Sequence, residues 1–400
     1  MIVGGAHGTI GLIRSLGRRG IPVWLLTSDH PIAKYSRYAT RSFTWAGPHH
    51  DGAVGFMLDL ARRHRLDGWV LMAAGDAEMQ LISKHHAELA SIFRVTVPPW
   101  DIARWAYDKR LTYQRAASLG IDYPLSYHPR DLQDVALLDC RFPVVLKPTV
   151  HEHRNEFTNA KAWRCDDRAS LLSRYEAAAG LVGAQGIALQ ELIPGGGETQ
   201  FSYAAVWDRG SPVASLIARR TRQYPVDFGI TSTFVETVER PEIEEAAGLF
   251  LRSLNYSGLV EVEFKYDKRD RRYKLLDVNA RAWTWNALGS IAGVDFAHVL
   301  WQVAVGEPIG PVRSHADAAW MHASRDIVAA CHGMLAGTLS PVGYLRDWQK
   351  PLVFAAFAKD DPLPGIIDLP LTAFRVLAAR MSGLARRVNE TCRSMLRPGH

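Results

Sequence analysis

The sequence predicts an α/β protein with a parallel sheet near its N-terminus and an antiparallel hairpin further along. Residues 1–104 alternate short apolar strands with helical stretches, a rhythm typical of parallel sheets. Residues 258–281 show two runs of strict apolar–polar alternation joined by a polar segment, which is the pattern of two half-buried strands. After residue 310 this order of motifs ends. We therefore expect an N-terminal domain over residues 1–104, a central domain over 105–310 and a mostly helical extension over 311–400.

Composition narrows the class of protein and of partner. Hydrophobic residues make up 48% and charged residues 22% of the 400 residues, which is ordinary for a globular protein. The net charge of +6 suits an anionic ligand such as a nucleotide, but no dense run of lysine and arginine points to nucleic acid. No apolar run reaches the ~18 residues of a membrane-spanning helix, and no signal peptide is visible. The four cysteines are far apart, which argues for a reducing compartment, so we expect a cytoplasmic protein.

Three glycines follow the first predicted strand. Gly5, Gly8 and Gly11 are spaced differently from the dinucleotide fingerprint G-x-G-x-x-G, so nicotinamide binding would rest on an incomplete motif. The alternatives are a tight turn that needs glycine for close packing, and an anion or substrate contact at a helix N-terminus. Asp76 lies at the end of another strand, where it is a candidate for binding a substrate amine or for capping the helix that follows.

The hairpin at residues 258–281 carries the strongest functional signal. If its turn centres near Asp270, Glu263 lies opposite Asp277 and Glu261 opposite Asn279, about 5 Å apart. Like charges so close repel each other, so a cation is expected between them. A small set of oxygen ligands suits Mg²⁺ that arrives on nucleotide phosphates. The alternative is a solvated face with surface ion pairs. The apolar positions, expected on the opposite face, are Val260, Val262, Phe264, Leu276, Val278 and Ala280.

Two lysines and a further strand precede the hairpin. Lys109 opens a helical stretch that ends near Gly120. Lys147 ends a buried strand, where a solvated lysine is less expected. Residues 188–193 form another short strand, closed by a proline and three glycines. Either lysine alone could be a surface residue, so it is their order with the other elements that is informative.

This order of elements resembles the ATP-grasp superfamily, in particular the ATP-dependent carboxylate–amine ligases related to D-aspartate ligase and to the pyrrolysine-biosynthesis ligase. The resemblance covers about residues 1–310 and rests on the hairpin, the strand ending at Lys147 and the segment of residues 220–229. It implies a pre-ATP-grasp domain with a Rossmann-like parallel sheet, followed by a two-lobed ATP-grasp domain whose lid lies at about residues 140–200.

The resemblance also implies roles for individual residues. Lys109 and Lys147 would hold the phosphates of ATP, and Arg281 would stabilise the phosphoryl group or a tetrahedral species. Arg220 is a candidate second clamp, since a guanidinium grips phosphate or carboxylate in bidentate fashion. The adenine hinge would be formed by Gln190, Glu191, Leu192 and Ile193, and Glu198 would contact the ribose. The ligands of Mg²⁺ or Mn²⁺ would be Glu263, Asp277 and Asn279.

Two features depart from the relatives or leave a choice open. The loop after the strand-end lysine, often rich in glycine in relatives, carries His151, His153 and Arg154, which contact phosphate or substrate or belong to a solvated loop. Trp283 and Trp285 follow the hairpin and either wall the substrate pocket or join an aromatic core, the commoner fate.

The activity that the resemblance implies joins a small carboxylate, such as an amino acid, to an amine at the expense of ATP, through an acyl phosphate. The alternatives are phosphate transfer without ligation, carboxylate–thiol ligation, nicotinamide-dependent oxidoreduction and nucleotide binding without catalysis.

A homodimer is expected only from the general frequency of dimers. Residues 371–396 place apolar residues at helical spacing among arginines, so we expect a helix packed on the body, with a helix on a membrane surface as the alternative.

Overall fold

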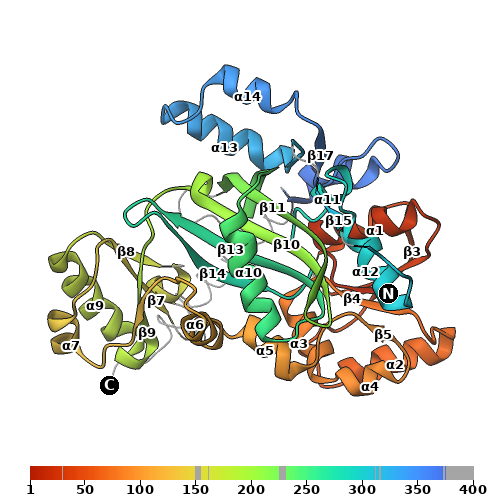
Figure 1. Ribbon diagram of the computed structural model, residues 1–400, viewed down its shortest axis with the longest axis horizontal. Helices are drawn as coiled ribbons and strands as arrows, with labels where there is room; N and C mark the ends of the chain where they lie inside the picture. Colours follow the sequence, from red (N-terminus) through yellow and green to blue (C-terminus); the bar gives the residue numbers. More distant parts are fainter. Residues whose placement is uncertain are drawn as a thin grey trace, which may run out of the picture.

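The computed structural model describes residues 1–28, 30–148, 155–160, 162–224, 231–310, 312–314, 317–372 and 374. Among these residues, the strands form a five-stranded, an eight-stranded and a four-stranded sheet. Figure 1 shows the eight-stranded sheet in the middle, the N-terminal domain on one side of it and the four-stranded sheet on the other. The arrangement leaves the hairpin of the large sheet facing the four-stranded one.

The N-terminal domain is built on a sheet that is parallel throughout. Its strands lie in the order β3-β2-β1-β4-β5, and the side chains of the three central strands are buried. This confirms the parallel sheet that the alternation of strands and helices predicts. The elements are β1 (Ile2–Val3), α1 (His7–Gly17), β2 (Val23–Thr27), β3 (Ala39–Thr44), α2 (Ala53–His64), β4 (Val70–Ala73), α3 (Asp76–Lys84), α4 (His86–Ala90) and β5 (Arg94–Val95).

The glycines around the start of α1 allow another part of the chain to pack closely on this helix. A Cβ on Gly8 would lie 2.8 Å from the carbonyl oxygen of Trp283, and one on Gly11 would lie 2.4 Å from Oδ1 of Asn286. Asn286 Nδ2 also donates to the Gly8 carbonyl at 2.8 Å. Close packing is therefore what these glycines provide, and the face of α1 that carries them is covered by protein.

The four-stranded sheet is antiparallel and has an apolar core of its own. Its strands lie in the order β6-β9-β7-β8, and side chains such as Val144, Leu171 and Leu189 are fully buried against its helices. This lobe contains the segment predicted as the lid, and its sheet begins upstream of residue 140. After α5 (Trp100–Tyr107) and α6 (Lys109–Ser118), its elements are β6 (Ser126–Tyr127), α7 (Leu132–Leu137), β7 (Val144–Pro148), α8 (Glu156–Asn159), β8 (Trp163–Cys165), α9 (Arg168–Val182) and β9 (Ile187–Glu191).

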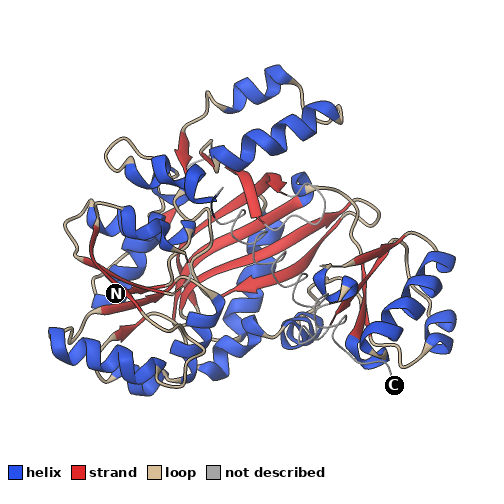
Figure 2. Ribbon diagram, turned by 180° about the vertical axis from the view of Figure 1, so that it is seen from behind, coloured by secondary structure: helices blue, strands red, loops and turns tan. Residues whose placement is uncertain are grey.

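The large sheet has helices on both faces, as Figure 2 shows from behind. Its strands lie in the order β14-β13-β10-β11-β12-β16-β17, and β15 pairs with β11. Alternate residues of β10 serve two cores: Tyr203 packs with α10, whereas Ala204 and Val206 pack with α12. The elements are β10 (Gln200–Asp208), β11 (Ser211–Tyr224), β12 (Thr231–Thr237), α10 (Pro241–Ser253), β13 (Gly258–Asp267), β14 (Arg272–Asn279), α11 (Leu288–Ile291) and α12 (Phe296–Val305).

The chain after residue 310 contributes strands as well as helices. β15 (Val312–Arg313), β16 (Ala319–Met321) and β17 (Leu352–Phe354) extend the large sheet, and α13 (Ala323–Leu335) and α14 (Pro341–Asp347) lie beyond it. The partly buried guanidinium of Arg222 in β11 anchors both helices, since it lies 2.9 Å from Asp326 and 2.5 Å from Asp347. The sequence pattern predicted helices here but not the strands, because strands of two or three residues show no readable alternation.

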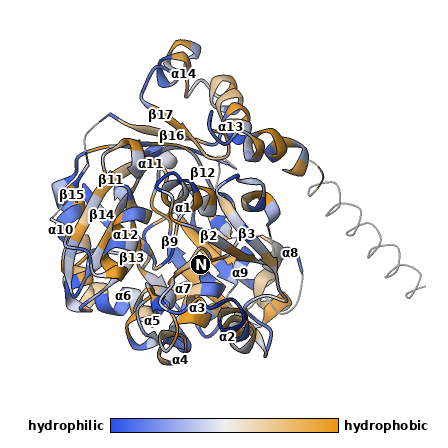
Figure 3. Ribbon diagram, turned by 90° about the vertical axis from the view of Figure 1, so that its right-hand side faces the viewer, coloured by the Kyte–Doolittle hydropathy of each residue, from blue (hydrophilic) through white to orange (hydrophobic). Residues whose placement is uncertain are grey.

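Helices α13 and α14 both contain hydrophobic residues, coloured orange in Figure 3. Leu335, Val342 and Leu345 are among the exposed apolar residues. No helix in the described part of the chain is long and apolar enough to cross a membrane. Most of residues 371–396, for which a packed or membrane-surface helix was predicted, lies outside the described residues.

Candidate active site

A cleft of about 900 Å³ lies between the four-stranded sheet and the hairpin β13–β14. It gathers residues from the lobe built on the four-stranded sheet, which is the predicted lid lobe, from α6 and from the large sheet. Both lysines, the predicted hinge, one arginine and the facing carboxylates therefore meet around one space. The predicted site residues that line it are Lys109, Lys147, Gln190, Glu191, Leu192, Ile193, Arg220, Glu263 and Asp277.

The hairpin has the predicted register at its functional end. Glu263 is paired with Asp277, and Glu261 is paired with Asn279. The four polar side chains are thus neighbours on one face of the sheet, as the alternation predicted.

A β-bulge changes the pattern nearer the turn. The register shifts between Glu263 and Phe264, so that Phe264 is paired with Leu275. Leu275 is fully buried, whereas Leu276 is partly buried and lines the cleft. The prediction that Leu276 faces the core is therefore wrong, because a bulge inserts one residue and interrupts the strict alternation.

Cations from other elements balance the facing carboxylates. Lys109 Nζ lies 3.0 Å from Asp277 Oδ2, and Arg220 donates to Glu263 Oε1 at 2.6 Å. Burial raises the pKa of Asp277 against the attraction of Lys109, and the charge of Glu263 adds to the rise. Each facing carboxylate is thus met by one cation, while burial and the charge of Glu263 disfavour the ionised form of Asp277.

Arg281 connects the hairpin with the N-terminal domain. Its guanidinium donates to the two carboxylate oxygens of Asp76 at 2.8 and 3.2 Å, and to Asn279 Oδ1 at 3.1 Å. Asp76 is the first residue of α3, and the N-cap position is occupied by Gly75. Capping, one of the two roles predicted for Asp76, is therefore wrong, and its contact with Arg281 was not predicted.

The side chain of Gln190 positions Lys147. Lys147 Nζ donates to Gln190 Oε1 at 2.6 Å, and Gln190 Nε2 donates to Ser126 Oγ at 2.8 Å. The amide is thereby oriented from β6 and presents its oxygen to the ammonium group. A residue predicted for the hinge thus also fixes a predicted phosphate-binding lysine.

Comparison with known proteins finds similar sequences and folds. Residues 220–311, which include Arg220 and the hairpin, match the family described as the carbamoyl-phosphate synthase L chain, ATP binding domain. The chain is 26% identical over 258 residues to the D-aspartate ligase of Enterococcus faecium, and the match covers 60% of this chain. The chain thus resembles ATP-grasp ligases in sequence and in fold. It spans about 60% of the length of the curated relative that it matches.

Solved structures share the fold at low sequence identity. The L-amino acid ligase from Bacillus licheniformis superposes with a TM-score of 0.57 at 16% identity, covering 76% of this chain and 73% of that one. A biotin carboxylase complex from Campylobacter jejuni gives a TM-score of 0.60 at 13% identity, covering 80% and 74%. These likenesses confirm the α/β ATP-grasp architecture predicted from the sequence.

Glu261 is a third carboxylate on this face of the hairpin, and the sequence pattern gave it no place among the metal ligands. Its side chain accepts from Ser202 Oγ at 2.9 Å and from Asn279 Nδ2 at 3.1 Å. Burial, and then the charge of Glu263, raise the pKa of Glu261 to about 7. Its alternation with Glu263 was visible in the sequence, but alternation does not report how deeply a side chain is buried.

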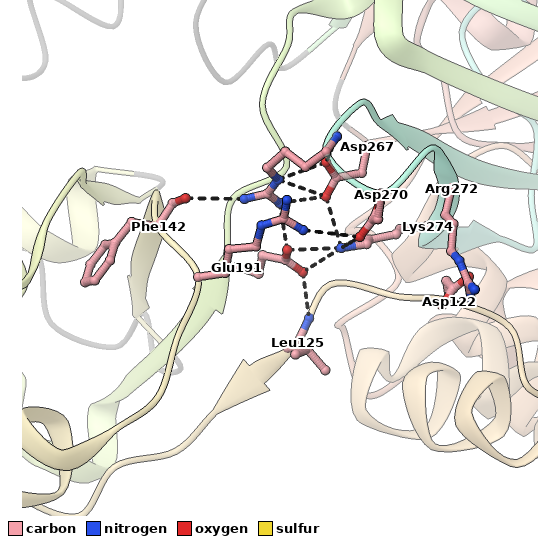
Figure 4. Close-up of polar contacts among 10 residues, drawn as sticks. Asp122, Leu125, Phe142, Glu191, Asp267, Asp270, Arg272 and Lys274 are labelled. Carbon is pink, nitrogen blue, oxygen red and sulfur yellow. Dashed lines mark hydrogen bonds and ion pairs between the residues drawn. The ribbon is translucent and has the colours of Figure 1, made fainter.

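Glu191 lies in a network of ion pairs between the hinge and the turn of the hairpin (Figure 4). Lys274 Nζ is 3.0 Å from each of its carboxylate oxygens, and Arg269 donates to it at 2.7 Å. Both cations also contact Asp267, and Arg269 donates to the carbonyl of Phe142 at 3.3 Å. The carboxylate of Glu191 therefore fastens the end of β9, the predicted hinge, to the hairpin.

Some backbone N–H groups of the predicted hinge already make hydrogen bonds within the protein. The N–H groups of Glu191 and Leu192 donate to the carbonyls of Leu125 and Pro143. Ile193 is 3% exposed and lines the cleft with the other hinge residues. Backbone readout of adenine would therefore use the remaining polar groups of this strand.

Glu198 does not lie with the other predicted site residues. Its carboxylate accepts from the N–H of Gly196 at 3.0 Å, and it lines a separate cleft of about 860 Å³ that also contains Arg219 and Arg240. The ribose contact remains a prediction.

The remaining candidates divide between the core and the residues that are not described. Trp283 and Trp285 are 2% and 1% exposed and pack in the core, so they do not wall a pocket. His151, His153 and Arg154 lie outside the described residues, as do residues 225–229 of the segment that supported the resemblance.

The donor set at the hairpin fits a magnesium ion. Carboxylate and amide oxygens are the ligands that this hard cation prefers, and burial of the acids disfavours their unneutralised charge. Glu263 and Asp277 already draw Arg220 and Lys109 toward them. Asn279 Oδ1 accepts from Arg281, so this amide would exchange that partner to bind a metal.

Proposed function

We propose that the protein is an ATP-dependent ligase that joins a carboxylate to an amine through an acyl phosphate, with release of ADP and phosphate. The observation that carries the proposal is the single cleft lined by Lys109, Lys147, Glu263 and Asp277. Both D-aspartate ligase and L-amino acid ligase, to which the chain is similar, are named as ligases of amino acids. An amino acid or a similar small carboxylate is therefore the substrate class that we propose.

The residues of the cleft supply positioning and charge. Lys109 and Lys147 would hold phosphate oxygens from opposite walls, and Gln190 keeps Lys147 directed for that task. Glu263, Asp277 and Asn279 would hold Mg²⁺, which neutralises the charge of the phosphates when it is bound. Arg220 and Arg281 flank these residues and would stabilise the transferring phosphoryl group and the tetrahedral species.

The chemistry then needs no nucleophile from the protein. An oxygen of the substrate carboxylate attacks the γ-phosphorus, the bond to the β–γ bridging oxygen breaks, and ADP leaves. The amine attacks the acyl carbon, loses a proton, and phosphate leaves. Much of the barrier is removed by holding the reactants in line and by fixed charges. Closure of the lid lobe over the cleft would exclude water from the acyl phosphate.

Two alternatives share the cleft and differ in the product. A phosphotransferase would stop at a phosphorylated product, and a thiol ligase would form a thioester. Nicotinamide chemistry is disfavoured because Trp283 and Asn286 pack on the glycines of α1. A binding protein without catalysis has no need for the paired acids and both lysines around the same space.

The test is a screen of amino acids, including D-aspartate, singly and in pairs for release of ADP from MgATP. The proposal expects turnover that requires an acid and an amine together, with an amide as product. With the acid alone, hydroxylamine should yield a hydroxamate, which a phosphotransferase acting on a hydroxyl group would not give. Formation of AMP, or ADP release that a thiol but no amine supports, would contradict it.

A further inference from the structure

A second group of polar side chains lies buried away from the cleft, where the C-terminal extension meets the N-terminal domain. His7 opens α1, His322 directly follows β16, and Asp368 lies in the helical residues 363–372. They are 6%, 1% and 5% exposed. One ligand atom from each lies within 4.8 Å of those from the other two. Three segments far apart in the sequence thus bring two imidazoles and a carboxylate to one place.

The polar contacts within the group leave one nitrogen of His322 without a partner. His7 Nε2 and Asp368 Oδ1 are 2.6 Å apart. Ser324 Oγ donates to Asp368 Oδ2 at 3.0 Å and lies 3.1 Å from His322 Nδ1. His322 Nε2, by contrast, is buried with no hydrogen-bond partner. An unpartnered buried polar atom carries a desolvation cost. The other ring nitrogen, His322 Nδ1, lies 4.0 Å from Asp368 Oδ2.

We propose that His7, His322 and Asp368 form a structural binding site for a divalent transition-metal ion of the zinc type. Imidazole nitrogens and a carboxylate oxygen are ligands that Zn²⁺ takes at about 2.0–2.2 Å, usually in a tetrahedron that a fourth donor completes. Ser324 Oγ lies beside the group and is positioned to be that donor or to orient a water.

The distances agree with this proposal after small rotations of side chains. Tetrahedral coordination separates ligand atoms by about 3.4 Å. The distance between His7 Nε2 and Asp368 Oδ1 would widen, while the longer separations, within 4.8 Å, would shorten. The ion would replace the proton shared by His7 and Asp368, so that metal binding releases a proton.

Such an ion would fasten the extension to the N-terminal domain at a junction already rich in polar contacts. Nearby on α1, Arg14 pairs with Asp361 at 2.9 Å with both side chains buried, and Arg18 pairs with Asp360 at 2.7 Å. The metal site would add a bond between His7 of the glycine turn and two residues of the extension. This assigns residues 317–372 a structural role that is independent of the ligase chemistry.

The test uses the full chain without a histidine tag, stripped with a chelator and then dialysed against Zn²⁺ or Mg²⁺. We expect one Zn²⁺ per chain by elemental analysis and a rise in the midpoint of thermal unfolding with Zn²⁺ but not with Mg²⁺. His322→Gln and Asp368→Asn should each weaken zinc binding by at least about tenfold. His49→Gln, at an exposed histidine, should leave zinc binding unchanged.

Two further measurements locate the ion within the molecule. Asp277→Asn, which alters the cleft, should retain the zinc if the ion lies at the proposed site. Co²⁺ bound to the wild-type chain should show the visible absorption of a tetrahedral site with nitrogen ligands, which keeps the test decisive if a variant fails to fold. Failure of the folded wild-type chain to bind Zn²⁺, or full retention of zinc by His322→Gln and Asp368→Asn, would overturn the proposal and leave a hydrogen-bonded pair only.

Discussion

Glu263 and Asp277 face each other across the hairpin, and each is met by one cation at the edge of the cleft. Their charges, rather than their shapes, are what the proposed chemistry uses. An amide of nearly equal size in place of either acid would remove the negative charge that attracts Mg²⁺ while leaving the fold intact, since Lys109 and Arg220 can still be solvated or hydrogen-bonded.

Glu263→Gln should therefore lower ligase turnover by about 100-fold or more, the order of loss seen when one electrostatic contact to a transition state is removed. Steady-state ADP release with MgATP and the substrate pair measures it. Glu242→Gln makes the same change of charge on an exposed position of α10 and should keep normal turnover. Equal activity of the two variants would contradict the role of Glu263.

Glu261 allows a test that needs no substrate. Its pKa is raised from 4.5 to about 7, so the folded protein holds a proton more tightly than the unfolded chain does. The free energy of unfolding should therefore fall as pH rises from about 4.5 to about 7. Glu261→Gln should flatten this dependence, as measured by urea unfolding at several pH values with a chelator present. Parallel pH profiles for wild type and variant would refute the contribution of Glu261 to this pH dependence.

At the scale of residues, the sequence predicted which side chains face each other across the hairpin but not how deeply they are buried. The period of two placed Glu263 opposite Asp277 because pairing follows directly from alternation. The alternation could not place Leu276, because a bulge depends on the packing of both strands. It also could not show the burial of Glu261, because that burial depends on the neighbouring strand β10. The contact between Asp76 and Arg281 joins two domains, so no local pattern predicts it.

Arg269 joins three segments at the scale of elements. It contacts Asp267 in the hairpin turn, Glu191 in the hinge and the carbonyl of Phe142 before β7. These contacts of Arg269, called the strap below, hold the predicted hinge in place, and Arg269 itself does not touch the nucleotide in the proposed mechanism. Its loss should therefore affect nucleotide binding more than the chemical step.

Arg269→Met should raise KM for ATP about tenfold, with a smaller effect on kcat, because the hinge would no longer be held against the hairpin. Arg271→Met removes the same charge from the same turn, at an exposed residue, and should change neither value. Direct binding of ATP, followed by calorimetry, checks the KM effect. A fall in kcat alone, or the same shift in both variants, would be inconsistent with a strap.

The sequence predicted some helices and strands better than others. The helices and strands of the N-terminal domain were readable because apolar periods and glycine turns mark them locally. The strands β15, β16 and β17 were not, since they are short and owe their conformation to pairing with the large sheet.

At the scale of the molecule, the extension and the body are joined through buried charge. Arg222 on β11 pairs with Asp326, which is fully buried, and with Asp347. A buried charge left without its partner is costly, so this contact controls whether the extension remains docked.

Arg222→Met should lower the free energy of unfolding by about 3 kcal/mol, as expected for one broken member of a buried pair. Chemical denaturation followed by circular dichroism provides the value. Arg346→Met, on an exposed position of α14, should cost less than about 0.5 kcal/mol. A loss of similar size in both variants would show that the pair does not anchor the extension.

The proposed ligase activity requires that an oxygen of the substrate carboxylate be phosphorylated in the cleft between the lid lobe and the hairpin. The most direct measurement supplies amino acids labelled with ¹⁸O in their carboxyl groups, together with MgATP and the amine, and follows the label by mass spectrometry. We predict one ¹⁸O atom in each phosphate released and ADP as the nucleotide product. Unlabelled phosphate, or AMP with pyrophosphate, would contradict the acyl-phosphate route.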